Sequence, residues 1–217
     1  MSSRKVVAVF GATGGQGASV ARALGRHPEY SVRGLTRDVN TTHAQKLRHD
    51  GVDLIGYNPY DRRSIESALA GAYAAFVNTI TDYNDPDCFE NEKTQGRLIA
   101  DACKAMGVGH VVFSSQLHTT RVSGILVRHM VAKAEIEDYM RDIRLPVTCL
   151  IMPIYYEDFC GLFKPRTSDG CNFDLCEFAL SLSVSLCAVC VCVCVCVCAC
   201  NERERERESA CVCVCVR

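Results

Sequence analysis

Residues 6–17, VVAVFGATGGQG, decide how this chain folds. The β-branched and apolar residues 6–10 are typical of a buried strand, and the residues after Gly17 have the apolar spacing of a helix. Between them Gly11, Gly14 and Gly17 follow the pattern G-x-x-G-x-x-G. After a strand and before a helix, these glycines permit a tight turn, close approach of a pyrophosphate and close helix–strand packing. The segment predicts a dinucleotide-binding loop; the alternative is a glycine-rich structural turn in another βαβ unit.

Strands and helices alternate along the first 150 residues. The expected strands are residues 6–10, 31–36, 52–57, 74–79, 111–115 and 146–152, and the expected helices are residues 17–26, 42–50, 62–70, 92–106 and 132–143. This alternation predicts an α/β fold, a doubly wound parallel sheet with right-handed crossovers. Ligands of such sheets bind at the carboxyl ends of the strands. The residues expected there are Gly11 to Gln16, Arg37, Asn58, Thr79 and Ser114.

Arg37 ends the second expected strand and predicts which dinucleotide binds. An acidic residue at this place accepts a hydrogen bond from the ribose 2′-hydroxyl of NAD, whereas a cation accommodates the 2′-phosphate of NADP. A guanidinium offers paired donors that suit phosphate. The residue therefore favours NADP over NAD, and an ordinary solvated surface arginine is the alternative.

Composition narrows the classes of partner. The chain has 217 residues and a formal net charge of −1, which indicates neither nucleic acid nor an anionic membrane as a partner. The apolar run after Lys5 is too short for the core of a signal peptide, so we expect a cytoplasmic protein, with the nucleus as a second location. No metal site is expected, because His110 and His118 lack metal-ligand spacing with the cysteines.

The cysteines divide the chain in two. Of the 16, only Cys88, Cys103, Cys149 and Cys160 precede residue 170. Within residues 175–217, Cys alternates with Val over residues 189–198 and 211–216, and Glu alternates with Arg over residues 202–208, patterns that TG and GA dinucleotide repeats encode. We therefore expect a folded domain over residues 1–174, followed by a low-complexity tail that is not a folded domain.

The uncharged residues 179–200 are long enough to cross a bilayer. However, their Cys-Val alternation favours extended structure, and no aromatic belt flanks them. We therefore predict no membrane insertion.

Six segments, in this order, resemble the NmrA-like family, whose members are atypical relatives of the short-chain dehydrogenases. The segments are VVAVFGATGGQGASVARAL, LTRD, GAYAAFVNT, HVVFSS, KAEIEDYMRDI and PIYYEDF. The resemblance covers about residues 5–170 and is greatest to the redox-sensor type. It implies that a small C-terminal lobe would follow where this chain has its low-complexity tail. It implies an NADP(H)-binding Rossmann domain that senses cofactor level without clear turnover, has regulatory protein partners and forms a homodimer.

The resemblance also implies cofactor contacts on the matching positions. They are the glycine loop Gly11, Ala12, Thr13, Gly14, Gly15 and Gln16; Arg37 at the 2′-phosphate; Asn58 and Pro59 near the adenine; Thr79, Ile80 and Thr81 near the nicotinamide; Lys133 at the ribose; and Tyr155, Tyr156, Glu157 and Asp158 in a loop over the nicotinamide. The pair Asn58-Pro59 departs from the aspartate-rich segment expected after the third strand.

The helix that carries Lys133 bears on catalysis. Dehydrogenases of the wider superfamily use Tyr-x-x-x-Lys, in which the lysine lowers the tyrosine pKa so that tyrosine passes a proton to the substrate. Here His129 stands in the tyrosine position, four residues before Lys133. Histidine shuttles protons near neutral pH, but we expect His129 to be an exposed or packed helix residue and predict no catalytic residue.

Three functions remain open from the sequence. The first is an NADPH-sensing regulatory protein, which the missing tyrosine favours. The second is an NADPH-dependent reductase of a small carbonyl or quinone. The third is a truncated product without function.

Overall fold

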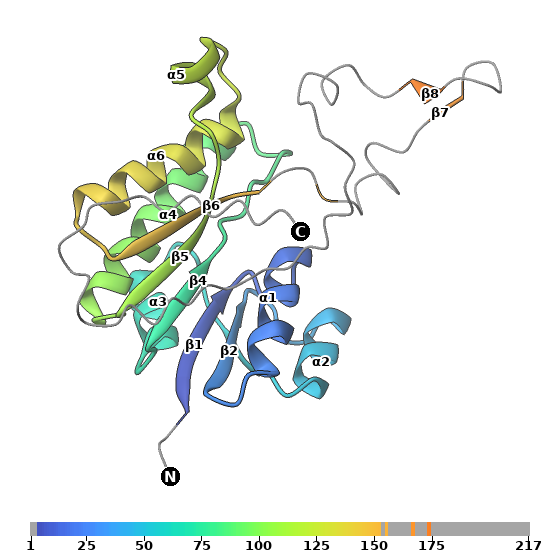
Figure 1. The fold of residues 1–217 in the computed structure, drawn as a ribbon, viewed down its shortest axis with the longest axis vertical. Coiled ribbons are helices and arrows are strands. Elements are labelled where there is room, and N and C mark those ends of the chain that lie inside the picture. The colour runs from blue at the N-terminus through green and yellow to red at the C-terminus, as the bar shows by residue number, and fades with distance from the viewer. Residues whose placement is uncertain (1–3, 153–154, 156–165, 168–172, 175–217) are drawn as a thin grey trace. The chain divides into compact units, whose positions relative to one another are not determined.

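The computed structural model describes residues 4–152, 155, 166–167 and 173–174. Six strands form one sheet in the order β3-β2-β1-β4-β5-β6, and every neighbouring pair is parallel (Figure 1). They are β1 (Lys5–Phe10), β2 (Tyr30–Thr36), β3 (Asp53–Gly56), β4 (Ala74–Val77), β5 (His110–Ser115) and β6 (Val147–Ile151). The predicted doubly wound α/β fold is confirmed. The chain changes direction across the sheet between β1 and β4, which is where such folds bind ligands.

Helices cover both faces of this sheet. They are α1 (Gly15–Gly25), α2 (Thr42–His49), α3 (Arg62–Leu69), α4 (Cys88–Ala105), α5 (Thr119–Ser123) and α6 (Arg128–Asp142). Helices α1 and α2 lie on one face, and α3, α4 and α6 lie on the other (Figure 1).

Strand β1 shows why two apolar layers form. Its side chains alternate between the faces, so Val7 and Val9 join the layer under α1 and α2. Ala8 and Phe10 join the layer under α3, α4 and α6. A strand buried on both faces is continuously apolar, which is the pattern that predicted this strand.

The close approach of α4 and α6 depends on Gly96. A Cβ atom at Gly96 would lie 2.5 Å from Cγ1 and 2.6 Å from Cγ2 of Ile136 on α6. Ile136 is itself buried. The missing side chain lets the middle turns of the two helices pack closely against each other.

The helix starts differ from those predicted. Helix α4 begins at Cys88 rather than residue 92, and α6 begins at Arg128 rather than residue 132. The first turns of both helices carry polar residues, so apolar periodicity does not reveal them. The short helix α5 was not predicted from the sequence.

The described residues after β6 belong to a second compact unit. Within it β7 (Arg166–Thr167) and β8 (Phe173–Asp174) pair antiparallel. The boundary at residue 174 and the low-complexity tail stay predictions, because the tail lies outside the described residues. Among the helices that the structure does describe, none has the length and apolar character needed to cross a bilayer.

Candidate functional site

Two hollows lie at the carboxyl end of the sheet. They have volumes of about 420 Å³ and about 290 Å³. Arg37, Tyr57 and Ile80 line both of them. The smaller is also lined by Gly11, Thr13, Gly14, Leu35, Thr36, Asn78 and Thr79. It therefore lies where β1 and β4 diverge, the place at which the doubly wound fold predicts a ligand.

The glycine loop forms one wall of the smaller hollow. Gly11 has a φ of 63°, a conformation that favours glycine, and its carbonyl accepts a hydrogen bond from the Gly14 amide at 2.9 Å. A Cβ atom on Gly17 would overlap the Gly11 carbonyl oxygen and lie 2.7 Å from its carbonyl carbon. The loop can therefore take this shape only with glycine at position 17, as the motif predicts.

The start of α1 faces this loop. The residue before the helix is Gly14, which has no side chain to accept hydrogen bonds, and the first turn carries no acidic residue. The first amides of α1 have no acceptor within the helix. Together with the helix dipole these amides form a site that fits a phosphate group. The residues present therefore fit the pyrophosphate of a dinucleotide.

Three further residues of the predicted loop are held by neighbouring strands. The buried Ala12 donates from its amide to the carbonyl of Leu35 at 3.2 Å. The hydroxyl of Thr13 lies 3.2 Å from that of Thr36. The amide oxygen of Gln16 accepts a hydrogen bond from Ser114 at 2.9 Å, which ties the loop to the end of β5. Gln16 and Ser114, which the sequence predicted at the ends of two different strands, are thus in contact.

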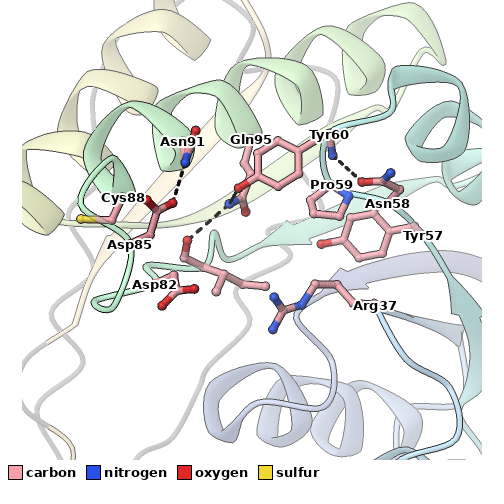
Figure 2. Close-up of a pocket in the computed structure, with 11 residues that line it drawn as sticks. Arg37, Tyr57, Asn58, Pro59, Tyr60, Asp82, Asp85, Cys88, Asn91 and Gln95 are labelled. Carbon is pink, nitrogen blue, oxygen red and sulfur yellow. Dashed lines mark hydrogen bonds between the residues drawn. The ribbon is translucent and has the colours of Figure 1, made fainter.

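Arg37 follows β2 and is exposed above both hollows. Figure 2 shows its guanidinium reaching along the larger hollow, opposite the wall made by Tyr57 and Pro59. Burial raises the pKa of Tyr57 to about 12, against the opposing effect of the Arg37 charge. Across residues 4–152, no ion pair engages the guanidinium of Arg37.

The larger hollow also contains the predicted adenine contacts Asn58 and Pro59. The side-chain oxygen of Asn58 accepts from the Tyr60 amide at 3.0 Å, so it shapes the turn as well as lining the hollow. Helix α4 supplies the opposite wall, where Gln95 donates to the Tyr60 hydroxyl at 2.9 Å (Figure 2). The other lining residues are Asp82, Asp85, Cys88 and Asn91.

The residues after β4 divide between the hollow and the protein interior. Thr79 and Ile80 line the smaller hollow. Thr81, predicted beside them, turns its hydroxyl to the carboxylate of Glu92 at 2.7 Å. The strand itself ends at Val77, two residues before the predicted end, because the chain leaves the sheet to form this wall.

Glu92 is a buried charged residue beside the site that sequence reasoning missed. It is 0% exposed, and its carboxylate accepts from Thr79 at 2.7 Å and lies 2.7 Å from the ammonium of Lys133. The Lys133 ammonium also donates to the hydroxyl of Thr79 at 2.9 Å and to its carbonyl at 3.1 Å. The sequence signal that could have found it is helical spacing. Glu92 lies four and seven residues before the buried Gly96 and Ile99, on the same face of α4.

His129 lies one turn before Lys133 on α6. Its ring contacts that of Tyr83 at a centroid distance of 5.6 Å, and the residue is half-buried. Burial lowers the pKa of His129, with Glu92 raising it and Lys133 lowering it further. The imidazole is therefore largely neutral at pH 7, which makes it a weak proton donor.

The residues predicted to form a loop over the nicotinamide lie outside the unit that contains the six-stranded sheet or outside the described residues. Tyr156, Glu157 and Asp158 lie outside the described residues, and Tyr155 belongs to the second unit, so the nicotinamide loop stays a prediction. Within the described part of the chain, His, Cys, Asp and Glu side chains form no group of three or more that could hold a metal ion.

Comparisons with known proteins agree with this geometry. The NmrA-like family model matches residues 3–181. The NmrA-like family domain-containing oxidoreductase himF of Aspergillus japonicus is 34% identical over 157 residues, which cover 70% of this chain and 47% of the relative. The chain thus spans about half the length of the curated relatives it matches.

Solved structures show the same likeness. The negative transcriptional regulator NmrA in complex with NADP is 26% identical, with a TM-score of 0.62, over 71% of this chain and 47% of that chain. Its complex with NAD is 27% identical, with a TM-score of 0.64, over 72% of this chain and 48% of that chain.

Proposed function

This chain belongs to the NmrA-like family, and from that membership and the site's geometry we propose that it binds NADP(H) as a redox sensor. In this role the protein responds to occupancy of its dinucleotide site and passes that state to a regulatory partner, without clear turnover. The observation that supports the proposal most is that the glycine loop, up to Gly14 directly before α1, and Arg37 line one hollow.

The residues present suit the parts of the cofactor. The first amides of α1 would hold the pyrophosphate, and the larger hollow beside Asn58 and Pro59 would take the adenine. Thr79 and Ile80 line the smaller hollow and Lys133 donates to Thr79, so we place the nicotinamide ribose beside these residues. When bound, the reduced nicotinamide supplies a hydride.

Arg37 is the residue that we propose selects NADP(H) over NAD(H). A 2′-phosphate carries negative charge and three acceptor oxygens, which an arginine fork binds better than a ribose hydroxyl. NmrA itself has been solved with either dinucleotide, so the preference in this chain rests on its own arginine.

The sensor function is supported by the residue that replaces the dehydrogenase tyrosine. A neutral, half-buried His129 beside a paired Lys133 is poorly placed to protonate a substrate. We further propose that the protein acts in the cytoplasm and nucleus and forms a homodimer, as expected for a sensor with protein partners.

A second candidate function is an NADPH-dependent reductase of a small carbonyl or quinone. It is favoured by the curated relatives, which are named as oxidoreductases.

One pair of measurements separates these functions. NADPH fluorescence is titrated with the full 217-residue chain, and NADPH consumption is then followed with a panel of quinones and aldehydes. Saturable binding without consumption supports the sensor. Steady consumption would overturn it in favour of the reductase, and the lack of any binding would contradict both.

A further inference from the structure

We propose that Glu92 is a positioning residue, whose buried carboxylate holds Lys133, Thr79 and Thr81 in place for the nicotinamide-ribose end of the cofactor. The inference rests on the proposed function, because it requires a nicotinamide dinucleotide in the cleft beside the glycine loop. It assigns a role to a residue that contacts the predicted binding residues but lines neither hollow.

The carboxylate of Glu92 joins three chain segments. It accepts from the hydroxyls of Thr79 and Thr81, which follow β4, and pairs with Lys133 on α6, each at 2.7 Å. Glu92 itself is on α4, where the close contact of Gly96 with Ile136 brings the two helices together. One side chain therefore sets the mutual position of three of the contacts expected at this end of the site, Thr79, Thr81 and Lys133.

Burial explains why this arrangement needs a carboxylate. The Glu92 side chain is 0% exposed and that of Lys133 only 12% exposed. An ammonium in such surroundings is stable only when an opposite charge and hydrogen-bond acceptors replace its water. Glu92 supplies that charge and one of the acceptors inside the wall of the site.

The hydrogen-bond donors of Lys133 show how the Glu92–Lys133 pair would bind a ligand. An ammonium has three N–H donors, and here the acceptors are Glu92, the Thr79 hydroxyl and the Thr79 carbonyl. A ribose hydroxyl could therefore be bound only in place of one of the Thr79 acceptors. The charged partner Glu92 would keep the ammonium in position during that exchange.

Fixing Lys133 in advance should strengthen ligand binding. A free lysine side chain has many rotamers, and binding a ligand would restrict them. Because Glu92 already restricts this side chain, less conformational entropy is lost when the ribose binds. The benefit applies only to ligands that carry the nicotinamide ribose.

The test compares two ligands with four forms of the full chain. NADPH and adenosine 2′,5′-bisphosphate are titrated calorimetrically into the wild type, Glu92→Gln, Thr81→Val and Glu90→Gln. Adenosine 2′,5′-bisphosphate carries the adenine and 2′-phosphate but no nicotinamide ribose. Glu90 is the matched control, because it is an exposed acid on the same helix that pairs only with Lys93 among the described residues.

We expect Glu92→Gln to weaken NADPH binding by about tenfold or more, since a charged hydrogen bond is lost. Binding of adenosine 2′,5′-bisphosphate should change by less than about twofold, which is the size of ordinary surface effects. Thr81→Val should weaken NADPH binding by a smaller factor in the same direction. Glu90→Gln should leave both affinities unchanged.

An equal loss for both ligands in Glu92→Gln would overturn the inference, because it would show a merely structural role. Unchanged affinity for both would overturn it too. If Glu92→Gln does not fold, Thr81→Val decides by the same comparison of the two ligands. A wild type that binds neither ligand refutes the proposed function itself, whereas a wild type that binds both, with no selective loss in the variants, refutes only the role of Glu92.

Discussion

The Oε1 atom of Glu92 lies 2.7 Å from the Nζ atom of Lys133, in an ion pair between α4 and α6 that solvent barely reaches. Removing one member of such a pair leaves a buried charge without a partner. We therefore expect Lys133→Met to lower the free energy of unfolding by about 3 kcal/mol or more. Urea denaturation measures this change.

The double variant Lys133→Met, Glu92→Gln gives the control for this prediction. Because it removes both charges, its loss of stability should be smaller than the sum of the two single losses by about 1 kcal/mol or more. Lys46→Met, at an exposed lysine on α2, should change stability by less than about 0.5 kcal/mol. Strictly additive losses would show that the two residues do not stabilise one another.

Gly17 tests the shape of the glycine loop. Gly17→Ala places a Cβ atom against the carbonyl group of Gly11, and backbone cannot move aside as a flexible side chain can. We expect the variant to lose measurable NADPH binding, as judged by fluorescence titration. Gly25→Ala, at the end of the same helix with open space around its Cβ, should bind as the wild type does. Wild-type affinity in Gly17→Ala would mean that the loop is shaped differently.

Gly96 tests the packing of α4 on α6. A methyl group there meets the buried Ile136, and overpacking of this kind costs about 1–3 kcal/mol. Gly96→Ala should therefore destabilise the protein in thermal or urea unfolding, although alanine favours a helix by up to about 1 kcal/mol over glycine. In Gly25→Ala only the helix preference acts, so this variant should be as stable as the wild type or more so. A stabilised Gly96→Ala would refute the close helix contact.

Cys103, which is buried, and Cys149, which is half-buried, give a pH-dependent prediction. Burial raises the thiol pKa to about 12 for Cys103 and also for Cys149. At pH 8.5 only about one thiol in a thousand or fewer is then ionised, compared with about half of ordinary cysteines. Because the thiolate is the reactive form, iodoacetamide should label both residues far more slowly in the native protein than in urea. Peptide mapping by mass spectrometry follows each residue separately, and equal rates in the two conditions would contradict their burial.

The fold, the glycine loop and Arg37 were predictable because the sequence signals for them are local. The glycine loop is encoded within residues 6–17, and Arg37 directly follows the next strand, β2. The alternation of apolar strands and amphipathic helices predicts the parallel sheet with no knowledge of which helices touch.

Glu92 could not be assigned a role in this way. Its partner Lys133 lies on another helix, and their meeting depends on how Gly96 and Ile136 pack. The first turn of α4 also escaped prediction, since its polar residues face solvent or the larger hollow rather than the core. Contacts between elements distant in sequence are set by packing, which apolar periodicity does not report.

The most direct test of the central claim is calorimetric titration of the full chain and Arg37→Ala with NADPH and NADH. The account predicts that the wild type binds NADPH about tenfold or more tightly than NADH, since a charged hydrogen bond to the 2′-phosphate is involved. Arg37→Ala should abolish that difference and leave NADH binding intact, whereas Arg48→Ala, at an exposed arginine on α2, should preserve it. Equal affinity for the two dinucleotides in the wild type, or a preference that survives Arg37→Ala, would contradict the account.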